Sequence, residues 1–152
     1  MTTEAIALSE LSGQKGRELG PSAWHTITQH DIDVYADLTG DDNPIHVDEA
    51  AAAASPFGGR IAHGMLTLSM VVRPLREIYR VSGATTGIVY GFDRIRFPAP
   101  VPSGSRIRVS GRIAEVEERQ DAVQVTLALA FEVDGGGAKP AVVAELVLRH
   151  FR

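Results

Sequence analysis

The stretch Met65-Leu66-Thr67-Leu68-Ser69-Met70-Val71-Val72 decides the fold of this chain, because it is apolar nearly all round. A helix with this pattern is buried rather than exposed at a surface. It begins near Gly64, and Pro74 is expected to kink or restart it before its apolar face ends at about Arg80. The sequence therefore predicts one central helix that other elements must cover.

Four segments after this helix often alternate Val, Ile and Leu with polar residues, a pattern typical of strands. Stretches with turn or loop chemistry separate them. Their bounds are Gly87 to Phe97, Ser105 to Val116, Ala122 to Val133 and Ala141 to Phe151. Because long strands need apolar cover on one face, we expect an α+β fold in which a curved antiparallel sheet wraps around the central apolar helix.

The length of 152 residues fits one domain, residues 1–152, with an N-terminal arm over residues 1–22 and a short strand at Trp24 to Ile27. The chain has 15 basic and 19 acidic residues, a formal net charge of -4, and no basic tract interleaved with aromatic side chains. This balance argues against nucleic acid as a partner. Cysteine is absent, which excludes disulfides, thiolate nucleophiles and cysteine metal sites.

Neither a signal peptide nor a membrane span is expected. The first twenty residues contain Glu4 and Glu10 and lack the apolar core of a signal peptide. No run approaches the roughly 18 consecutive apolar residues of a membrane-spanning helix. We therefore expect a cytoplasmic protein without membrane contacts.

Two further helices are predicted ahead of the central one. Thr28 is a plausible N-cap, and Asp31 three residues later completes a pattern like a capping box. The periodicity that follows predicts an amphipathic helix over residues 29–38, which Gly40 ends. Asp48-Glu49 before five alanines indicates a second, short helix with acidic residues at its positive end.

A polar loop between these helices carries the most informative chemistry, with Asp41 and His46 five residues apart. Pro44 stiffens it by fixing its own φ and by pushing Asn43 out of the α region. An acid that takes a proton from water and an imidazole that holds another are the minimum equipment for adding water to a carbon framework or removing it. The alternative is that Asp41 caps the turn made by Asn43-Pro44 and that His46 is a satisfied polar residue near the surface.

The start of the central helix, Ala62-His63-Gly64-Met65, is a second candidate site. Backbone N–H groups in the first turn of a helix have no intrahelical partner, so the Gly64 N–H can bind an oxyanion such as a polarised thioester oxygen. The alternatives are tight packing for Gly64 and a buried, hydrogen-bonded imidazole for His63. Met65, Leu68 and Met70 either line a tunnel beside the helix or belong to the core.

Other chemistries find less support in the sequence. Asp41, His46 and His63 are legitimate zinc ligands, but their spacing matches no common zinc pattern, so we expect no metal. The chain has no Gly-x-Ser-x-Gly elbow, no Gly-x-Gly-x-x-Gly turn and no phosphate loop. Nucleophilic serine chemistry and a nucleotide cofactor held in either of these ways are therefore not expected.

The run from Tyr35 to His46, continuing to Ala52, resembles the signature of the MaoC-like (R)-specific enoyl-CoA hydratases. In that signature an aromatic, an aliphatic and a small residue precede Gly-Asp-x-Asn-Pro, an aliphatic residue and His. The likeness extends to Ala62-His63-Gly64-Met65 and to the segment Arg96 to Gly104, and so covers most of the chain. The whole chain is also similar to the nodulation protein N-like subgroup of the family.

The resemblance implies a hot-dog fold, a homodimer whose two sheets join edge to edge, and an acyl-CoA thioester as the substrate, with no metal or other cofactor. By the same resemblance Asp41 activates water, His46 positions that water and supplies a proton to the α-carbon, and the Gly64 N–H binds the thioester oxygen. We expect substrate contacts at Asn43, which also holds the loop in shape, and at His63, Met65 and Arg96.

Arg94 and Arg96 lie on the strand that leads to the proline-rich loop, where they could meet the phosphates of the coenzyme, and we favour Arg96. As exposed strand arginines they are equally well explained by solubility.

These observations favour the reversible hydration of a trans-2-enoyl-CoA to the (R)-3-hydroxyacyl-CoA. One alternative is a non-catalytic module that binds acyl thioesters, or the structural subunit of a heterodimeric dehydratase, although such a protein needs no pair like Asp41 and His46. A second alternative is an acyl-CoA thioesterase, which shares the fold and the helix-end oxyanion site but breaks a different bond.

Overall fold

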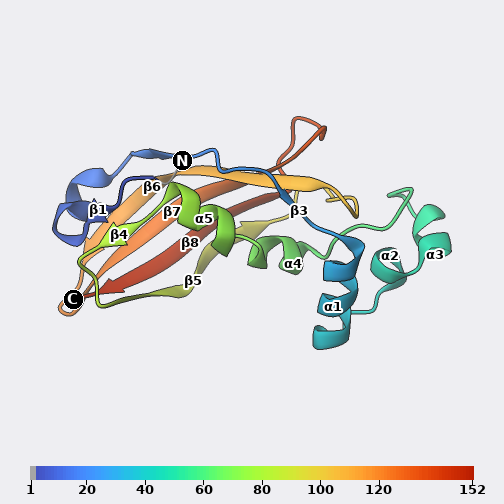
Figure 1. Ribbon diagram of the computed structural model, residues 1–152, viewed down its shortest axis with the longest axis horizontal. Helices are drawn as coiled ribbons and strands as arrows, with labels where there is room; N and C mark the ends of the chain where they lie inside the picture. Colours follow the sequence, from blue (N-terminus) through green and yellow to red (C-terminus); the bar gives the residue numbers. More distant parts are fainter. Residues whose placement is uncertain (1–2) are drawn as a thin grey trace.

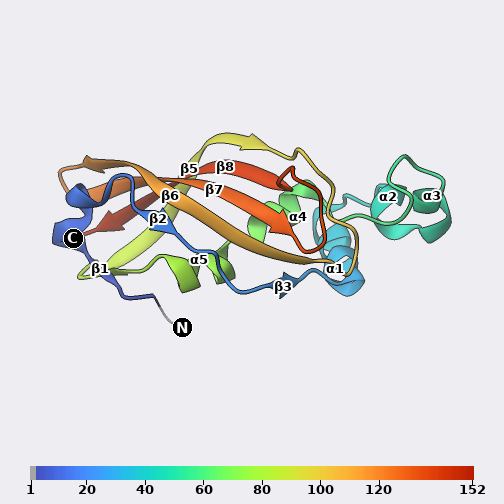
Figure 2. The ribbon, with the colours of Figure 1, turned by 90° about the horizontal axis from the view of Figure 1, so that it is seen from above.

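A six-stranded antiparallel sheet forms the body of the protein, which a computed structural model describes over residues 3–152 (Figure 1). Its strands are β2 (Glu18–Leu19), β3 (His25–Thr26), β5 (Thr86–Arg96), β6 (Arg106–Glu118), β7 (Ala122–Val133) and β8 (Val142–Phe151). They stand in the order β2-β6-β7-β8-β5, and β3 also pairs with β6. Seen from above, β5 lies at one long edge and the N-terminal strands lie at the other (Figure 2).

The four long strands predicted from alternating residues are confirmed to within two residues at each end. In β7 the side chains of Val123, Val125 and Leu127 are fully buried, whereas Ala128 and Ala130 on the other face are partly exposed. Successive side chains of a strand point to opposite faces, so this alternation gives the sheet one apolar face and one exposed face.

Two short helices, α4 (Gly64–Ser69) and α5 (Val72–Ile78), lie across the apolar face of the sheet (Figure 1). Leu66 and Leu68 of α4 and Ile78 of α5 belong to the same hydrophobic core as the inward side chains of the sheet. This arrangement confirms the predicted α+β architecture, with an antiparallel sheet against a central apolar helical segment.

The central helix nevertheless differs from the prediction in two respects. It breaks at Met70 and Val71, before Pro74, because the ring of Pro74 would clash with the Met70 carbonyl if one helix ran through both. The expectation that it is buried nearly all round was also wrong, since Met65 is 53% exposed and Val72 is 49% exposed. The two helices therefore cover the sheet with one side only.

The N-terminal segment packs along the sheet. β1 (Ile6–Ala7) pairs in parallel with β4 (Val81–Ser82), the strand after α5, and is followed by a 3-10 helix, η1 (Leu8–Gln14). Leu11 and Leu19 are buried in the main core. Most of the arm predicted over residues 1–22 thus contributes to the fold, while its first two residues lie outside the described range.

Three helices gather beyond one end of the sheet: α1 (Gln29–Thr39), α2 (Pro44–Val47) and α3 (Glu49–Ala53) (Figures 1 and 2). The predicted limits of α1 are confirmed, because Thr28 and Asp31 form a capping box and Gly40 ends the helix at a φ of 77°. Asp48 caps α3, as its sequence indicates. No helix within residues 3–152 is long and apolar enough to cross a membrane.

The segment predicted as a loop from Asp41 to His46 is partly helical, and this prediction was wrong for its second half. Pro44 begins α2, because proline at a first helical position loses no helical hydrogen bond. Asn43 caps the turn, with its side-chain oxygen accepting a hydrogen bond from the Ile45 N–H at 3.3 Å. His46 therefore sits on a short, capped helical turn whose position is well defined.

Candidate active site

His46 is buried and held in one orientation. It is 7% exposed, and its Nδ1–H donates to the carbonyl oxygen of Ile61 at 2.7 Å. A carbonyl oxygen only accepts, so this bond places the proton on Nδ1 and leaves Nε2 as the nitrogen that can exchange a proton. The surface position considered for His46 from the sequence is therefore excluded.

His63 supports both predicted catalytic residues from behind. Its ring is 2% exposed and stacks on the ring of His46, with centroids 3.9 Å apart and an interplanar angle of 31°. Its Nε2–H donates to the backbone carbonyl of Asp41 at 2.8 Å. The other ring nitrogen, Nδ1, is buried and has no hydrogen-bond partner within residues 3–152. His63 thus ties α4, Asp41 and His46 together.

Asp41 brings its carboxylate to the two imidazoles. One oxygen of Asp41 and one nitrogen each of His46 and His63 all lie within 4.8 Å of one another. Asp41 itself is exposed, whereas both rings are buried. The predicted meeting of the acid and the imidazole of this segment is therefore present.

The same three residues could in principle ligate a metal, since a carboxylate and two imidazoles are ordinary zinc ligands. The lone pairs of an imidazole lie in the plane of its ring, and the two rings here are stacked within 31° of parallel. Their lone pairs therefore run side by side instead of meeting about 2 Å away, at the distance of a metal–nitrogen bond. The stacked rings are therefore poorly arranged to share one metal ion.

A pocket of about 250 Å³ lies beside His46 at the start of α4. Gly64 lines it together with His46, and most of the remaining wall is apolar. A Cβ at Gly64 would come within 2.9 to 3.1 Å of the ring of Phe97, so only glycine fits here without moving that ring. The sequence alternatives for Gly64 are therefore not exclusive: it packs tightly against Phe97 and also presents its backbone to the pocket. The other lining residues are Phe57, Ile61, Ala62, Thr67, Phe97, Pro98, Ala99, Pro100, Val101 and Ala141.

The remaining predicted contact residues lie around this centre at different depths. Asn43 caps α2 and His63 stands behind His46, so both support the site more than they line it. Met65 follows Gly64 and is half exposed. Arg96 is exposed at the end of β5, where its guanidinium donates to the Ile95 carbonyl at 2.6 Å, one residue before Phe97 of the pocket wall. These four do not converge on one point.

Two supporting residues were not predicted from the sequence. Gln29 at the start of α1 donates its Nε2 to the backbone carbonyl of His46 at 2.8 Å. The ring of Tyr35 packs on His63, with centroids 4.7 Å apart. Both lie on α1, whose amphipathic pattern is visible in the sequence, but nothing in that pattern distinguishes a contact to His46 from an ordinary packing contact.

Comparison with known proteins places this geometry in a family. The MaoC like domain family matches residues 10–133. The chain is 45% identical over 150 residues to 3-hydroxyacyl-thioester dehydratase Z of Mycobacterium tuberculosis, which covers 98% of this chain and 97% of that protein. It is 41% identical over 145 residues to nodulation protein N of Rhizobium meliloti, covering 93% of this chain and 89% of that protein.

Solved structures agree with these relatives. A monoamine oxidase regulatory protein from Archaeoglobus fulgius superposes with a TM-score of 0.79 at 27% identity, covering 100% of this chain and 98% of that one. An (R)-hydratase from A. caviae gives a TM-score of 0.64 at 26% identity, covering 88% and 96% respectively. The hot-dog architecture expected from the sequence is thus shared with solved relatives, and the chain belongs to the MaoC-like domain family.

Proposed function

We propose that the protein catalyses the reversible hydration of a trans-2-enoyl-CoA to the (R)-3-hydroxyacyl-CoA. The observation that carries this proposal is the convergence of the Asp41 carboxylate and the His46 ring within 4.8 Å, beside a pocket that His46 shares with Gly64. A relative named as a 3-hydroxyacyl-thioester dehydratase, and therefore for the reverse direction, supports the reaction type. A solved (R)-hydratase of similar fold supports the stereochemistry.

Proton transfer is assigned to the two side chains that meet. In the hydration direction the Asp41 carboxylate removes one proton from water, whose oxygen bonds to the β-carbon while the electron pair of the double bond moves toward the thioester oxygen. Protonated Nε2 of His46 then gives its proton to the α-carbon. Return of the proton from Asp41 to His46 resets the site, and the reverse sequence removes water.

The Gly64 N–H is assigned to the thioester oxygen. It lies in the first turn of α4, where a backbone N–H has no intrahelical acceptor, and the residue lines the pocket beside His46. A donor placed where negative charge develops stabilises the enolate-like transition state. Because the thioester makes the β-carbon electrophilic and this N–H stabilises the charge, the proposed reaction needs neither a metal nor a redox cofactor.

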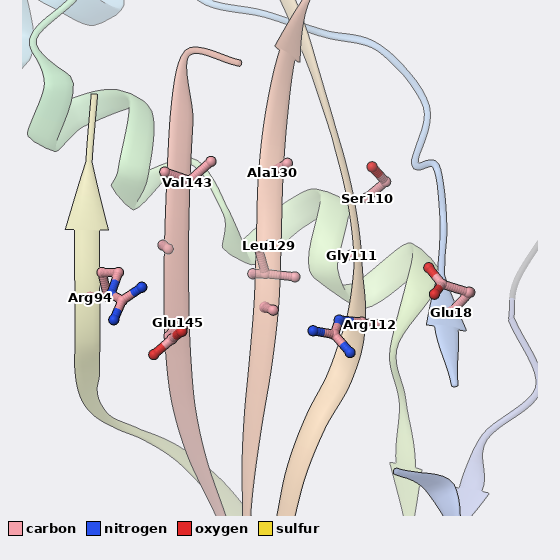
Figure 3. Close-up of a pocket in the computed structure, with 11 residues that line it drawn as sticks. Glu18, Arg94, Ser110, Gly111, Arg112, Leu129, Ala130, Val143 and Glu145 are labelled. Atoms are coloured by element: carbon pink, nitrogen blue, oxygen red, sulfur yellow. The ribbon is translucent and has the colours of Figure 1, made fainter. Parts of the chain in front are cut away.

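The acyl chain is assigned to the apolar wall of the pocket, where Phe57, Phe97 and Val101 lie. Met65 is half exposed next to Gly64 and is available to the substrate at the same end of α4. Arg96 is the candidate for the phosphates of the coenzyme, since it is exposed and directly precedes Phe97. Arg94, two residues earlier on β5, points to the same side of the strand and lines the outer face of the sheet (Figure 3), so Arg96 is the candidate only through its place at the strand end beside Phe97.

A homodimer joined through the edges of two sheets is part of the proposal. Within residues 3–152, β5 pairs only with β8, which leaves its other edge open. Ile88, Val89 and Tyr90 on this edge strand are 44%, 53% and 56% exposed. An open edge with large apolar side chains is a template for pairing with another chain.

Incubation of the purified protein with crotonyl-CoA tests the proposed function. Loss of the enoyl absorbance without release of free thiol, with (R)-3-hydroxybutyryl-CoA as the product, is the expected result. Free thiol would instead identify a thioesterase. No reaction with crotonyl-CoA or with longer trans-2-enoyl-CoA substrates, despite binding of the thioester, would identify a non-catalytic module or a structural subunit.

A further inference from the structure

The outer face of the sheet, opposite α4 and α5, carries a hollow of about 440 Å³ that the proposed reaction does not use (Figure 3). Its floor is made of small residues, Ser110, Gly111, Ala128 and Ala130, on β6 and β7. Charged side chains stand on both sides of the floor in Figure 3. We propose that this face binds the same face of a second copy of the chain.

One row of residues across the sheet determines how two copies would fit. The register of the strands aligns Arg94 of β5 with Glu145 of β8, Glu145 with Ala128 of β7, Ala128 with Arg112 of β6, and Arg112 with Glu18 of β2. All five residues line the hollow. The charges along the row are therefore positive, negative, none, positive and negative, with Ala128 in the middle.

The four charged side chains of this row have no ion pair or hydrogen bond with any group of the described chain. Three other charged side chains of β6 are already paired within the chain. Arg108 bonds Glu132 at 2.5 Å, Lys15 bonds Glu115 at 2.8 Å, and Arg106 pairs with Asp134. The four charges of the central row are thus available to another molecule, while several charges around the row are already paired within the chain.

Two copies can face each other across a two-fold axis that lies midway between their sheets, parallel to β7 and over Ala128. In this arrangement the row of one copy meets a row of opposite charges on the other. This rotation exchanges the two sides of the row, so Arg94 of one copy faces the Glu18 position of the other, and Glu145 faces the Arg112 position. Ala128 then faces Ala128, where small side chains permit close approach. An isologous interface requires this self-complementarity, and each charge pair occurs twice in it.

Two single charge reversals and the variant that combines them test the interface. The measured quantity is the mass of the assembly in solution. Glu145→Arg alone, or Arg112→Glu alone, places like charges opposite each other across the axis, and each variant should have half the mass of the wild-type assembly at about 0.1 M salt, where screening is incomplete. The double variant Glu145→Arg/Arg112→Glu restores opposite charges across the axis and should regain the full mass.

Rescue by the double variant reports specifically on contacts between chains. Within one chain, residues 145 and 112 stand two strands apart, separated by Ala128, which is roughly 10 Å. The like-charge neighbours that the single variants create within the sheet, residue 145 beside Arg94 and residue 112 beside Glu18, persist in the double variant. A loss of mass caused by a weakened fold would therefore not be rescued.

Matched controls change the charge elsewhere on the surface. Glu10→Arg and Lys139→Glu alter exposed residues outside the hollow and should keep the wild-type mass. Ala128→Arg places a long side chain on the proposed axis and should halve the mass, while the unfolding temperature stays near that of the wild type. A wild-type assembly no larger than that of Glu145→Arg, or a double variant that remains at half mass, would overturn the proposal.

Discussion

The ring of His63 stacks on the ring of His46 at a centroid distance of 3.9 Å, while the Nε2–H of His63 holds the backbone carbonyl of Asp41. One buried side chain thus fixes both ends of the segment that carries the proposed acid and base. Since His63 itself does not line the pocket, we interpret it as a positioning residue.

Replacing His63 by alanine should lower kcat by about 10²-fold, because misplacing a catalytic group by about 1 Å costs that much. The KM should change little, since the pocket lining is unaltered. Steady-state kinetics with crotonyl-CoA measure the two constants separately. Tyr35→Phe keeps the aromatic contact to His63 and should remain close to the wild type. An equal loss in both variants would assign the effect to general packing.

Replacing Gly64 by proline removes its backbone N–H. A Phe97→Ala background removes the ring that any side chain at position 64 would meet. His63, with a ψ of 138°, has a conformation compatible with a following proline, and proline is tolerated at a first helical position. We expect Gly64→Pro in a Phe97→Ala background to lose about 10²-fold more kcat than Gly64→Ala in that background, since a missing oxyanion donor costs about this factor. Similar activities in the two variants would show that glycine is required for packing alone.

The stability of the sheet should depend on pH through His150. It is 9% exposed, hydrogen-bonds with the Tyr79 hydroxyl at 2.9 Å, and burial lowers its pKa below the usual value. Between that lowered pKa and about 6.5, the unfolded chain binds a proton that the folded chain does not. The free energy of unfolding should therefore fall as the pH drops below about 6.5.

Denaturant unfolding of the wild type and of His150→Gln across pH 5 to 8 measures this dependence. In His150→Gln the free energy of unfolding should fall less steeply with decreasing pH than in the wild type. His30→Gln changes an exposed histidine and should show the wild-type dependence. A wild-type slope that persists unchanged in His150→Gln would assign the dependence to another group.

The capping box of α1 should contribute measurably to stability. The Thr28 hydroxyl accepts a hydrogen bond from the Asp31 N–H at 3.1 Å, and the Asp31 carboxylate accepts one from the Thr28 N–H at 2.8 Å. Loss of such a cap costs about 1 kcal/mol, so Thr28→Ala should lower the Tm by about 2 to 4 °C. Thr26→Ala, an exposed residue nearby, should leave the Tm unchanged in the same thermal scan.

Local patterns predicted the parts of this protein that local physics determines. The strands of the sheet follow from their alternation, and the limits of α1 follow from Thr28 and Gly40, because these signals act within a few residues. The break at Met70 was placed too late, since Pro74 acts on the carbonyl four residues before it. The half-helical nature of the Asp41 to His46 segment was missed because α2 is a single turn and has no periodicity to recognise.

Contacts between distant residues could not be predicted in this way. The Ile61 carbonyl that sets the tautomer of His46 is a backbone atom, which every residue possesses. The support that His63 gives to Asp41 spans 22 residues and depends on how α4 meets α1 and α2. The resemblance of the motif indicated the candidate residues, whereas the hydrogen bonds that orient them required the structure.

The most direct measurement of the central claim is the turnover of crotonyl-CoA by Asp41→Asn, His46→Gln and the double variant. Each single variant should fold as the wild type does and lose about 10³-fold in kcat, within the range typical of general acid–base groups. Because both residues act in one cycle of proton transfer, the double variant should lose little more than the slower single variant. Ordinary turnover in either single variant, or losses that multiply in the double variant, would contradict the account.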